Sequence, residues 1–430
     1  MLVSKKLVIV AVFALFLTSV NAQNTTSPYS RYGYGVLKDK AIGASKGMGG
    51  ISYGVRGQNT NPGNPASYSA VDSLTFIFDM GVSYSKARLS DVNASQTDDN
   101  GGLDYLTMLF PIGKKIGVSF GILPYSSVGY SFGVNKTEGG VSYQEYFSGS
   151  GNLSQIYGGI AYEMPIKGLS VGANVSYLFG RLKHDRSLPF STTTIYTRTE
   201  YKKLSVSAAK FDIGVQYQLP LSNNKKVLTL GAVFTPQIKT SARASRREVL
   251  SSGDTLTYTS PTGTNAGLPL TIGGGFTLSN KRNLLFGADF TFQKWQDLDY
   301  PAEMNDNMTS SDRFNNRYRA NAGVEYVVDP FDRNFWRKIK LRAGVNYSNS
   351  YLNVKNNLGE SGGYKEYGAT IGFGIPMARD VYTQRVSYLN LSFEYTTLRP
   401  ELNNMVKEQY FGVSLNVNIN DLWFMKNKFK

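Results

Sequence analysis

Apolar and polar residues alternate with a period of two along most of the chain. In the segment from Leu74 to Tyr84, large apolar residues occupy every second position and mostly small or polar residues lie between them. Because successive side chains of a strand point to opposite faces, this pattern predicts a strand with one apolar and one polar face. The alternation returns at 116–122, 169–177, 211–219, 284–292, 318–326, 339–347, 367–375, 389–395 and 411–419, and less regularly near 103–110, 153–164, 228–238 and 268–278.

These segments predict fourteen strands, joined alternately by short and by long connections. Segments such as 111–115 and 165–168 are short, whereas 133–152, 184–203 and 241–266 are long and polar. Short turns at one end and long loops at the other are typical of outer-membrane β-barrels. A closed barrel also pairs every backbone polar group, as hydrocarbon requires. We therefore expect an all-β transmembrane antiparallel β-barrel of about 14 strands.

A secreted β-sandwich is the alternative fold, because its strands alternate in the same way. The number of long strands, the asymmetric connections and the aromatic residues near strand ends favour the barrel, in which aromatic girdles lie at both membrane interfaces. The residues expected in these girdles are Tyr125, Tyr162, Tyr217, Trp295, Tyr326, Trp336, Tyr347 and Trp423.

Both ends of the sequence carry basic residues next to apolar ones. Lys5 and Lys6 precede an apolar run that is too short to cross a bilayer, and Ala22 ends a small-residue site. Residues 1–22 are therefore predicted to be a cleaved secretory signal. We expect residues 74–420 to form the barrel in a bacterial outer membrane, with the basic tail 421–430, the short turns and both termini in the periplasm.

Residues 23–73 do not alternate and are rich in Gly, Asn, Ser and Tyr. A disordered leader is one interpretation of such a segment. However, Pro62 and Pro65 fix their own φ angles and restrict the residues before them, Asn61 and Asn64. A fourteen-stranded barrel has a lumen too wide for its own side chains to fill. The segment is therefore predicted to be an N-terminal hatch inside the lumen.

Composition excludes several kinds of chemistry. The 430 residues include no Cys and one His, which removes disulfides, thiolate metal sites and cysteine nucleophiles. Neither a metal nor a cofactor is expected. His184 and Asp185 are adjacent, but no Ser can be assigned to complete a triad, so we expect no enzyme activity. The net charge is +15, yet only 18% of residues are charged, and nucleic-acid binders concentrate basic residues more tightly.

If the apolar faces meet lipid, the alternate positions of the strands face the lumen. Glu325 and the pair Lys340 and Arg342 flank one short connection, which predicts a cross-strand ion pair. Inward charges could hold the hatch, bind a carboxylate head group or satisfy one another, and mutual pairing is favoured because buried charges are normally paired. The charged residues expected to face the lumen are Asp79, Asp212, Asp289, Arg317, Arg319, Glu325, Lys340, Arg342, Glu366 and Glu394.

Further basic residues fall outside the apolar segments. Arg243, Arg246 and Arg247 lie in the longest predicted loop, and Arg181 and Lys183 precede another. Contact with anionic lipopolysaccharide or an acidic partner is one interpretation. Solvated charge without a specific ligand is the favoured one. On the short turns, basic pairs are expected at Lys114–Lys115, Lys225–Lys226, Lys281–Arg282 and Arg337–Lys338.

Several segments resemble the FadL family of outer-membrane transporters for hydrophobic compounds. Asn64-Pro65-Ala66 matches the hatch motif of that family. The segments "LPLTIGGGFTL" from Leu268, "NLLFGADFTFQKWQDL" from Asn283, "RYRANAGVEY" from Arg317 and "KLRAGVNYS" from Lys340 are similar to its later strands. The doubled Asn-Pro, with Asn61-Pro62 first, departs from the usual pattern. The tail "DLWFMKNKFK" and the many Tyr and Asn residues look like barrels of the Bacteroidota.

The resemblance implies a lateral route, in which a hydrophobic ligand leaves through a gap beside an inward kink of the third strand. That strand contains the breakers Gly121, Pro124 and Gly129. Pro124 either opens the wall or lies harmlessly above the membrane. The function implied is passive uptake of hydrophobic small molecules such as long-chain fatty acids. The alternative is a FadL-like scaffold that binds an outer-membrane protein in a secretion or assembly complex.

Overall fold

The computed structural model of the chain describes residues 25–422, apart from 93, 139–140, 190–195, 222–224, 281–282, 305–312, 331, 356–358, 380–384 and 404. The predicted signal segment 1–22, Lys281–Arg282 and the predicted tail from Trp423 onward lie outside the described residues. Among the described residues, no helix is both long enough and apolar enough to cross a membrane.

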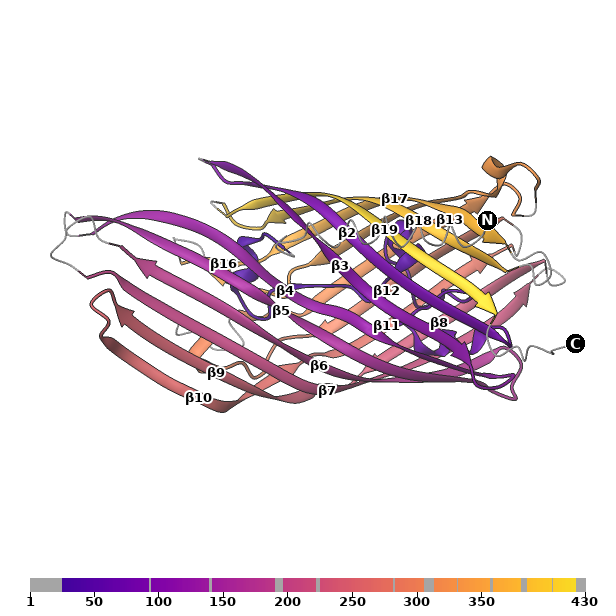
Figure 1. Cartoon of the computed structure of the whole chain (residues 1–430), viewed down its shortest axis with the longest axis horizontal. Helices are drawn as coiled ribbons and strands as arrows, with labels where there is room; N and C mark the ends of the chain where they lie inside the picture. The colour runs from indigo at the N-terminus through magenta and orange to yellow at the C-terminus, as the bar shows by residue number, and fades with distance from the viewer. Residues whose placement is uncertain are drawn as a thin grey trace, which may run out of the picture.

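The wall is a closed antiparallel barrel of 14 strands, as the alternation predicts (Figure 1). Closure comes from β19 pairing with β2, from Lys407 opposite Ser90 to Leu422 opposite Thr75. Two of the 14 wall strands are divided into two labelled pieces. One consists of β8 and β9, separated by residues 236–237, and the other of β10 and β11, separated by Pro269, which cannot donate a backbone hydrogen bond to the sheet. The strands are β2 (Thr75–Ser90), β3 (Ser95–Pro111), β4 (Ile116–Glu138), β5 (Val141–Glu163), β6 (Leu169–Leu188), β7 (Arg198–Leu221), β8 (Lys226–Thr235), β9 (Ile238–Leu250), β10 (Thr255–Leu268), β11 (Leu270–Ser279), β12 (Leu284–Lys294), β13 (Arg317–Val327), β14 (Lys340–Asn349), β17 (Tyr364–Arg379), β18 (Val386–Pro400) and β19 (Lys407–Leu422).

The two ends of the barrel differ. We call the end with the short connections the turn end and the opposite end the hairpin end. At the hairpin end the predicted long loops are wrong, because most of 133–152, 184–203 and 241–266 is paired strand. The extensions of β4 to β7, β9 and β10 project beyond the other strands (Figure 1). The outward positions of these extensions are mostly polar, whereas inward ones such as Leu182 and Leu204 are fully buried, so the apolar outward face that marks the other strands is missing although backbone pairing continues.

The outer face of the wall exposes the apolar set of each strand. Tyr162, Tyr217, Tyr326, Tyr347 and Trp336 are exposed, as the girdle prediction requires. Two other girdle predictions are wrong. The Trp295 side chain is 0% exposed inside the barrel, and Tyr125 lines an internal cavity. Trp295 follows the end of β12, and Tyr125 lies at a register shift of β4. At such points the inward and outward positions no longer alternate, so the sequence does not predict where either side chain points.

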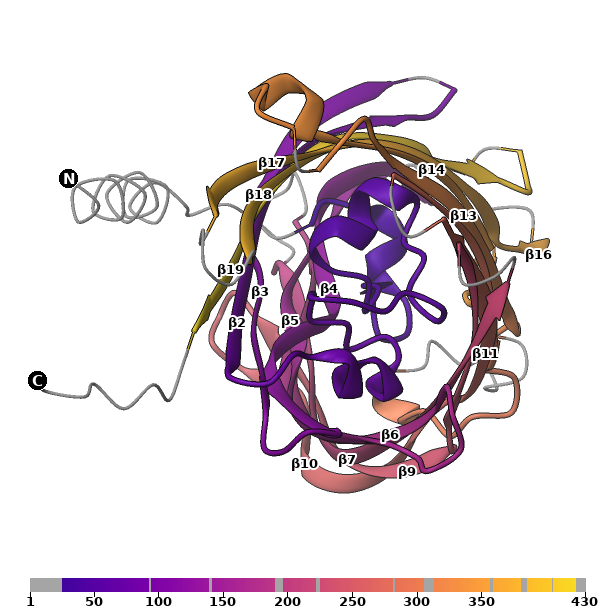
Figure 2. The same ribbon diagram turned by 90° about the vertical axis from the view of Figure 1, so that its right-hand side faces the viewer.

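Residues 25–74 run through the lumen, and we call them the hatch. Figure 2 shows the hatch in indigo, enclosed by the ring of strands. Its short elements are η1 (Pro28–Arg31), β1 (Val36–Leu37), η2 (Gly43–Met48) and η3 (Pro65–Ala70). The remaining small elements, all beyond the hatch, are η4 (Ala302–Met304), η5 (Phe335–Lys338) and the ribbon of β15 (Val354–Lys355) and β16 (Ser361–Gly362).

Candidate functional site: the hatch and the wall around it

The Asn-Pro segment of the hatch packs against a floor of glycines on the inner wall. A Cβ added to Gly172 of β6 would lie 2.6 Å from the Pro65 carbonyl carbon. A Cβ added to Gly214 of β7 would lie 2.7 Å from the Pro65 ring. Glycine therefore lets the wall backbone approach η3 directly. This floor was not predicted, although glycines at inward positions of neighbouring strands are a visible signal in the sequence.

The two asparagines of the motif fasten the hatch to itself and to the wall. Asn64 is 0% exposed, and its Nδ2 donates to the carbonyls of Tyr53 (2.8 Å) and Val215 of β7 (3.2 Å). Its Oδ1 accepts from the Ala66 amide, which caps η3. Asn61 Nδ2 donates to the carbonyls of Ser52 and Val55. Pro62 and Pro65 thus lie in a fixed turn rather than in a disordered leader.

Asp289 of β12 anchors a second part of the hatch. Its Oδ2 accepts hydrogen bonds from the backbone amides of Ser52 (2.5 Å) and Tyr53 (2.9 Å). Hydrogen bonds from backbone amides compensate a carboxylate for the water it loses on burial. Holding the hatch is therefore what the inward position of Asp289 does in this structure.

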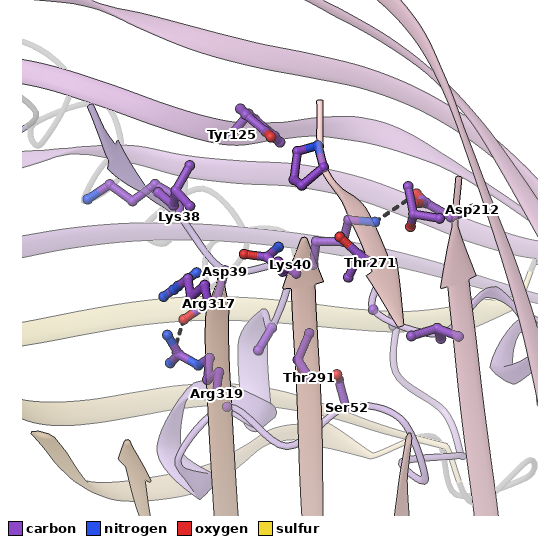
Figure 3. Close-up of a pocket in the computed structure, with 18 of the residues that line it drawn as sticks. Lys38, Asp39, Lys40, Ser52, Tyr125, Asp212, Thr271, Thr291, Arg317 and Arg319 are labelled. Atoms are coloured by element: carbon purple, nitrogen blue, oxygen red, sulfur yellow. Dashed lines mark hydrogen bonds and ion pairs between the residues drawn. The ribbon is translucent and has the colours of Figure 1, made fainter. Parts of the chain in front are cut away.

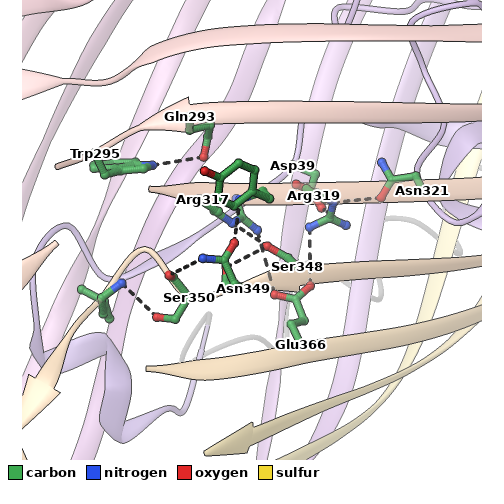
Figure 4. A network of polar contacts seen from close by, with 12 residues as sticks. Asp39, Gln293, Trp295, Arg317, Arg319, Asn321, Ser348, Asn349, Ser350 and Glu366 are labelled. Atoms are coloured by element: carbon green, nitrogen blue, oxygen red, sulfur yellow. Dashed lines mark hydrogen bonds and ion pairs between the residues drawn. The ribbon is translucent and has the colours of Figure 1, made fainter. Parts of the chain in front are cut away.

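Three charged wall residues and one hatch residue form a network beside the hatch (Figure 4). Arg319 of β13 forms ion pairs with Asp39 of the hatch (2.6 Å) and Glu366 of β17 (3.4 Å). Arg317 lies 4.0 Å from the same Glu366 and donates to Ser348. Charges of both signs therefore neutralise one another across the hatch–wall boundary.

The predicted cross-strand pair is confirmed near the turn end. Glu325 of β13 accepts from Lys340 (2.9 Å) and from Arg342 (2.7 Å), both on β14. Arg342 also donates to Asn390 of β18. Asp79 of β2, another predicted inward residue, accepts from Tyr105, Asn416 and Asn418. Glu394 of β18 accepts from Ser414. Glu325 therefore fits the interpretation that the inward charges pair with one another, whereas Asp79 and Glu394 are hydrogen-bonded to neutral side chains.

A cavity of about 120 Å³ lies between hatch and wall (Figure 3). A second one of about 270 Å³ adjoins it. The lining of the first cavity mixes apolar and charged side chains, and among the charged ones Lys40 is ion-paired with Asp212 of β7 at 2.7 Å. Lys38 lines both cavities, and its side chain is exposed to them within the barrel. Burial within the barrel lowers the pKa of Lys38, an effect that Asp104 opposes.

The wall opens between β3 and β4. Their pairing begins at Pro111 opposite Gly117 and ends at Leu106 opposite Ile122, although both strands continue toward the hairpin end. Pro124 lies at a bulge just beyond this point, where the register of β4 against β5 shifts. From Ser126 to Tyr130 every residue is buried, so β4 has bent inward. A third cavity, of about 170 Å³, lies at this opening and is lined by Lys38, Asp104, Ser126 and Ser127.

The three predicted breakers divide between these regions. Gly121 lies within the paired part of β4, opposite Thr107. Pro124 lies where the pairing with β3 has ended, and Gly129 lies in the inward segment. Two of the three predicted breakers thus lie in the part of β4 that is not paired with β3, and their role in a lateral route stays a prediction.

The hatch covers the free edge of β4. Strand β1 pairs with it, Val36 opposite Ser127 and Leu37 opposite Ser126. Gly35 has a φ of +83°, and a Cβ there would lie 2.5 Å from the Ser127 carbonyl oxygen. Gly129 exchanges hydrogen bonds with η1, accepting from the Ser27 amide and donating to the Ser30 hydroxyl. The inward segment of β4 is therefore bound to the hatch rather than to β3.

A cluster of aromatic side chains lies toward the hairpin end of the lumen. Tyr34 of the hatch packs edge-on against Tyr300, and Trp295 packs against Tyr351 with ring centroids 4.4 Å apart. Phe314 contacts three of these rings. Four of the five rings are at most 2% exposed and Tyr300 is 8% exposed, so the cluster is densely packed. The Tyr34 hydroxyl donates to the Gly267 carbonyl of β10, which ties the cluster to the wall.

The candidate catalytic pair is not arranged for hydrolysis. His184 Nδ1 is hydrogen-bonded to the Tyr130 hydroxyl at 2.8 Å. Asp185 occupies the opposite, outward face of β6, because neighbouring strand residues alternate in direction. The nitrogen that a triad carboxylate would orient is therefore engaged by a tyrosine.

The model of the BamG family matches residues 3–430 of the chain. No curated protein sequence matches it. Solved structures share the fold. The P. putida toluene transporter TodX has a TM-score of 0.58 and 15% identity, over 90% of this chain and 100% of its own.

Two further solved structures are similar in fold to this chain. A Pseudomonas aeruginosa FadL homologue has a TM-score of 0.57 and 13% identity, over 89% of this chain and 98% of its own. The Ralstonia pickettii toluene transporter TbuX has a TM-score of 0.55 and 12% identity, over 88% and 98%. The FadL resemblance seen in the sequence thus holds for the fold, while the matching family model is that of BamG. An origin in the Bacteroidota stays a prediction.

Proposed function

The chain belongs to the BamG family, and on that premise we propose that it is an outer-membrane barrel that binds a partner protein in a membrane assembly and keeps its own lumen closed. The observation that carries this proposal is the state of the lumen. The buried aromatic cluster around Tyr34 and Trp295 fills the hairpin end, and ion-paired side chains such as Lys40 and Asp212 line part of the cavity behind it.

A conduit for hydrophobic molecules needs an apolar lining, because such a ligand gains free energy by leaving polar surroundings. Around the cavities next to Lys38, Asp39 and Arg319, a hydrocarbon would have to displace water from charged groups, which costs free energy. A hatch that is hydrogen-bonded to the wall, as at Asn64 and Asp289, closes the lumen and holds the wall rigid. The strand extensions that project at the hairpin end offer a broad surface to a partner.

Passive uptake of hydrophobic small molecules, long-chain fatty acids among them, is the second candidate. The break between β3 and β4 beyond Ile122 favours it, since a ligand could leave the lumen there sideways. TodX, which is a toluene transporter, has the same fold. In this chain, the hatch strand β1 occupies the edge of β4 at that break.

Gentle extraction of the tagged barrel from its own membrane, followed by native mass spectrometry, tests the first proposal. We expect a second protein in fixed stoichiometry. In parallel, toluene and oleate uptake is measured in liposomes that contain the wild type or Y34A/W295A, in which the aromatic cluster is opened. We expect the wild type to match empty liposomes and the variant to exceed them. A barrel recovered alone, with wild-type uptake above empty liposomes, would instead support transport.

A further inference from the structure

Five basic residues lie together on the outer face of the wall. They are Arg181 and Lys183 on β6, Lys203 on β7, and Arg243 and Arg247 on β9, and we call them the basic patch. Four of them are exposed and Lys203 is half-buried. β6, β7 and β9 are direct neighbours in the sheet (Figure 1). The sequence placed Arg243 and Arg247 in a loop, whereas the structure fixes both on a strand.

The strand register brings these charges close to one another. Lys183 lies directly opposite Lys203, and Ser205 stands between Arg181 and Arg243 in the next row. Like charges directly opposite on neighbouring strands are destabilising. At the outward positions of 181–187, 199–207 and 241–249 the single carboxylate is Asp185. Among the described residues, no ion pair involves any member of the basic patch.

The inner face of the same strands is different. There Arg246 of β9 forms ion pairs with Glu200 and Glu248, and Arg198 of β7 pairs with Glu248. Arg186 of β6 pairs with Glu145 of β5. The sheet therefore balances its cations where they face the interior, and leaves them unbalanced where they face outward. An external anion would supply the missing charge.

The position of the basic patch relative to the lipid-facing band indicates which kind of anion it binds. On β6 the outward residues from Leu169 to Phe179 are apolar, and Val175 and Tyr177 are 56% and 55% exposed. Ten residues of a strand tilted by about 40° rise about 25 Å, the height of the lipid-facing band in outer-membrane barrels. Arg181 is the next outward residue after Phe179. The basic patch thus begins where the apolar band ends, at the level of lipid head groups.

We propose that the basic patch binds the phosphate groups of a phosphorylated glycolipid of the outer leaflet. The acyl chains of that lipid lie against Tyr177 and Phe179 below, and its phosphates lie between the side chains of Arg181, Lys183 and Arg243. Arginine suits this role because its planar guanidinium donates two hydrogen bonds to one phosphate. This interaction surface is independent of whether the barrel transports a ligand or binds a partner protein.

Native mass spectrometry of the full-length barrel in neutral detergent tests the proposal, with diphosphorylated lipid A and its dephosphorylated form as probes. The variant R181Q/K183Q/R243Q/R247Q removes four charges from the basic patch. The control K114Q/K115Q/K225Q/K226Q removes four exposed charges at the turn end. Heat-modifiable migration in gels shows that each barrel is folded. We expect the patch variant to bind diphosphorylated lipid at least about tenfold more weakly, and the control to bind it like the wild type.

Three outcomes would overturn the proposal. The first is wild-type binding by the patch variant. The second is an equal loss in the control, which would mean that only net charge matters. The third is equal binding of the dephosphorylated lipid, or full displacement of the lipid by polyglutamate at the same ionic strength, which would identify a general anion surface instead of a lipid site.

Discussion

Asn64 in the hatch and Val215 in β7 are joined by a hydrogen bond from the Asn64 side-chain amide to the Val215 carbonyl, 3.2 Å long. The bond crosses from the plug to the wall, and the Asn64 side chain that donates it is fully buried. The same amide also holds the Tyr53 carbonyl, so one side chain fixes the hatch internally and against the barrel.

We expect Asn64→Ala to loosen the hatch without opening the barrel. Its loss leaves the Tyr53 and Val215 carbonyls and the Ala66 amide without these partners, at a cost of about 2 kcal/mol or more. Hydrogen–deuterium exchange in peptides covering 52–70 then accelerates about 30-fold, while exchange in β7 is unchanged. Asn135→Ala, at an exposed site on β4, is the control. Unchanged exchange in 52–70 would contradict this role for Asn64.

The Glu325 pair gives a second prediction, on stability. Arg342 is 4% exposed, so Glu325→Gln leaves a buried cation without its carboxylate and destabilises the barrel by about 3 kcal/mol. The neutral triple variant E325Q/K340Q/R342Q costs less, because no charge remains unpaired. Equilibrium unfolding in urea measures both. Glu401→Gln is the control, because Glu401 pairs with Lys365 on an exposed surface, where such pairs contribute little. Equal losses in E325Q and E401Q would refute the prediction.

The wall of the barrel could be predicted because its outer face meets lipid and its inner face meets the polar lumen, which imposes an alternating pattern on each strand. Outward residues such as Val175 and Tyr177 meet lipid, so every second position is apolar and the strand can be read from the sequence. Beyond the bilayer that constraint ends. The paired extension of β9 around Arg243 therefore looked like a loop.

The site was less predictable, because its contacts join distant segments. The alternation along β12 predicts that Asp289 points inward, but nothing in the sequence indicates that its partners are the amides of Ser52 and Tyr53. Trp295 shows the converse problem. An aromatic residue just beyond a strand end suits a lipid girdle and an internal plug equally well, and only the path of the chain after Lys294 decides between them.

Lys38 gives the protein a pH dependence that can be isolated by substitution. Burial lowers its pKa in the folded state, so between that value and the unfolded value of about 10.4 the unfolded chain binds more protons. The contribution of Lys38 to stability therefore rises with pH in this window and is unfavourable below it. We expect Lys38→Met to raise the melting temperature at pH 7, and the gap to the wild type to shrink toward pH 10. Lys114→Met, at an exposed turn, is the control. A gap that widens as the pH rises would contradict the lowered pKa.

An engineered disulfide between β1 and β4 separates the two proposed functions. Leu37 and Ser126 are opposite residues of an antiparallel pair, whose Cα atoms lie about 5 Å apart, as a disulfide requires. The chain has no Cys, so L37C/S126C forms one defined bond that locks the hatch onto the free edge of β4. For a partner-binding barrel with a closed lumen, we expect the oxidised and reduced forms to retain the same partner and to show the same background uptake of toluene in liposomes. Ser126→Cys alone controls for the thiol. Uptake that is present in the reduced form, lost on oxidation and restored by dithiothreitol would show that a ligand passes between β3 and β4, because the locked segment is the one that borders that opening.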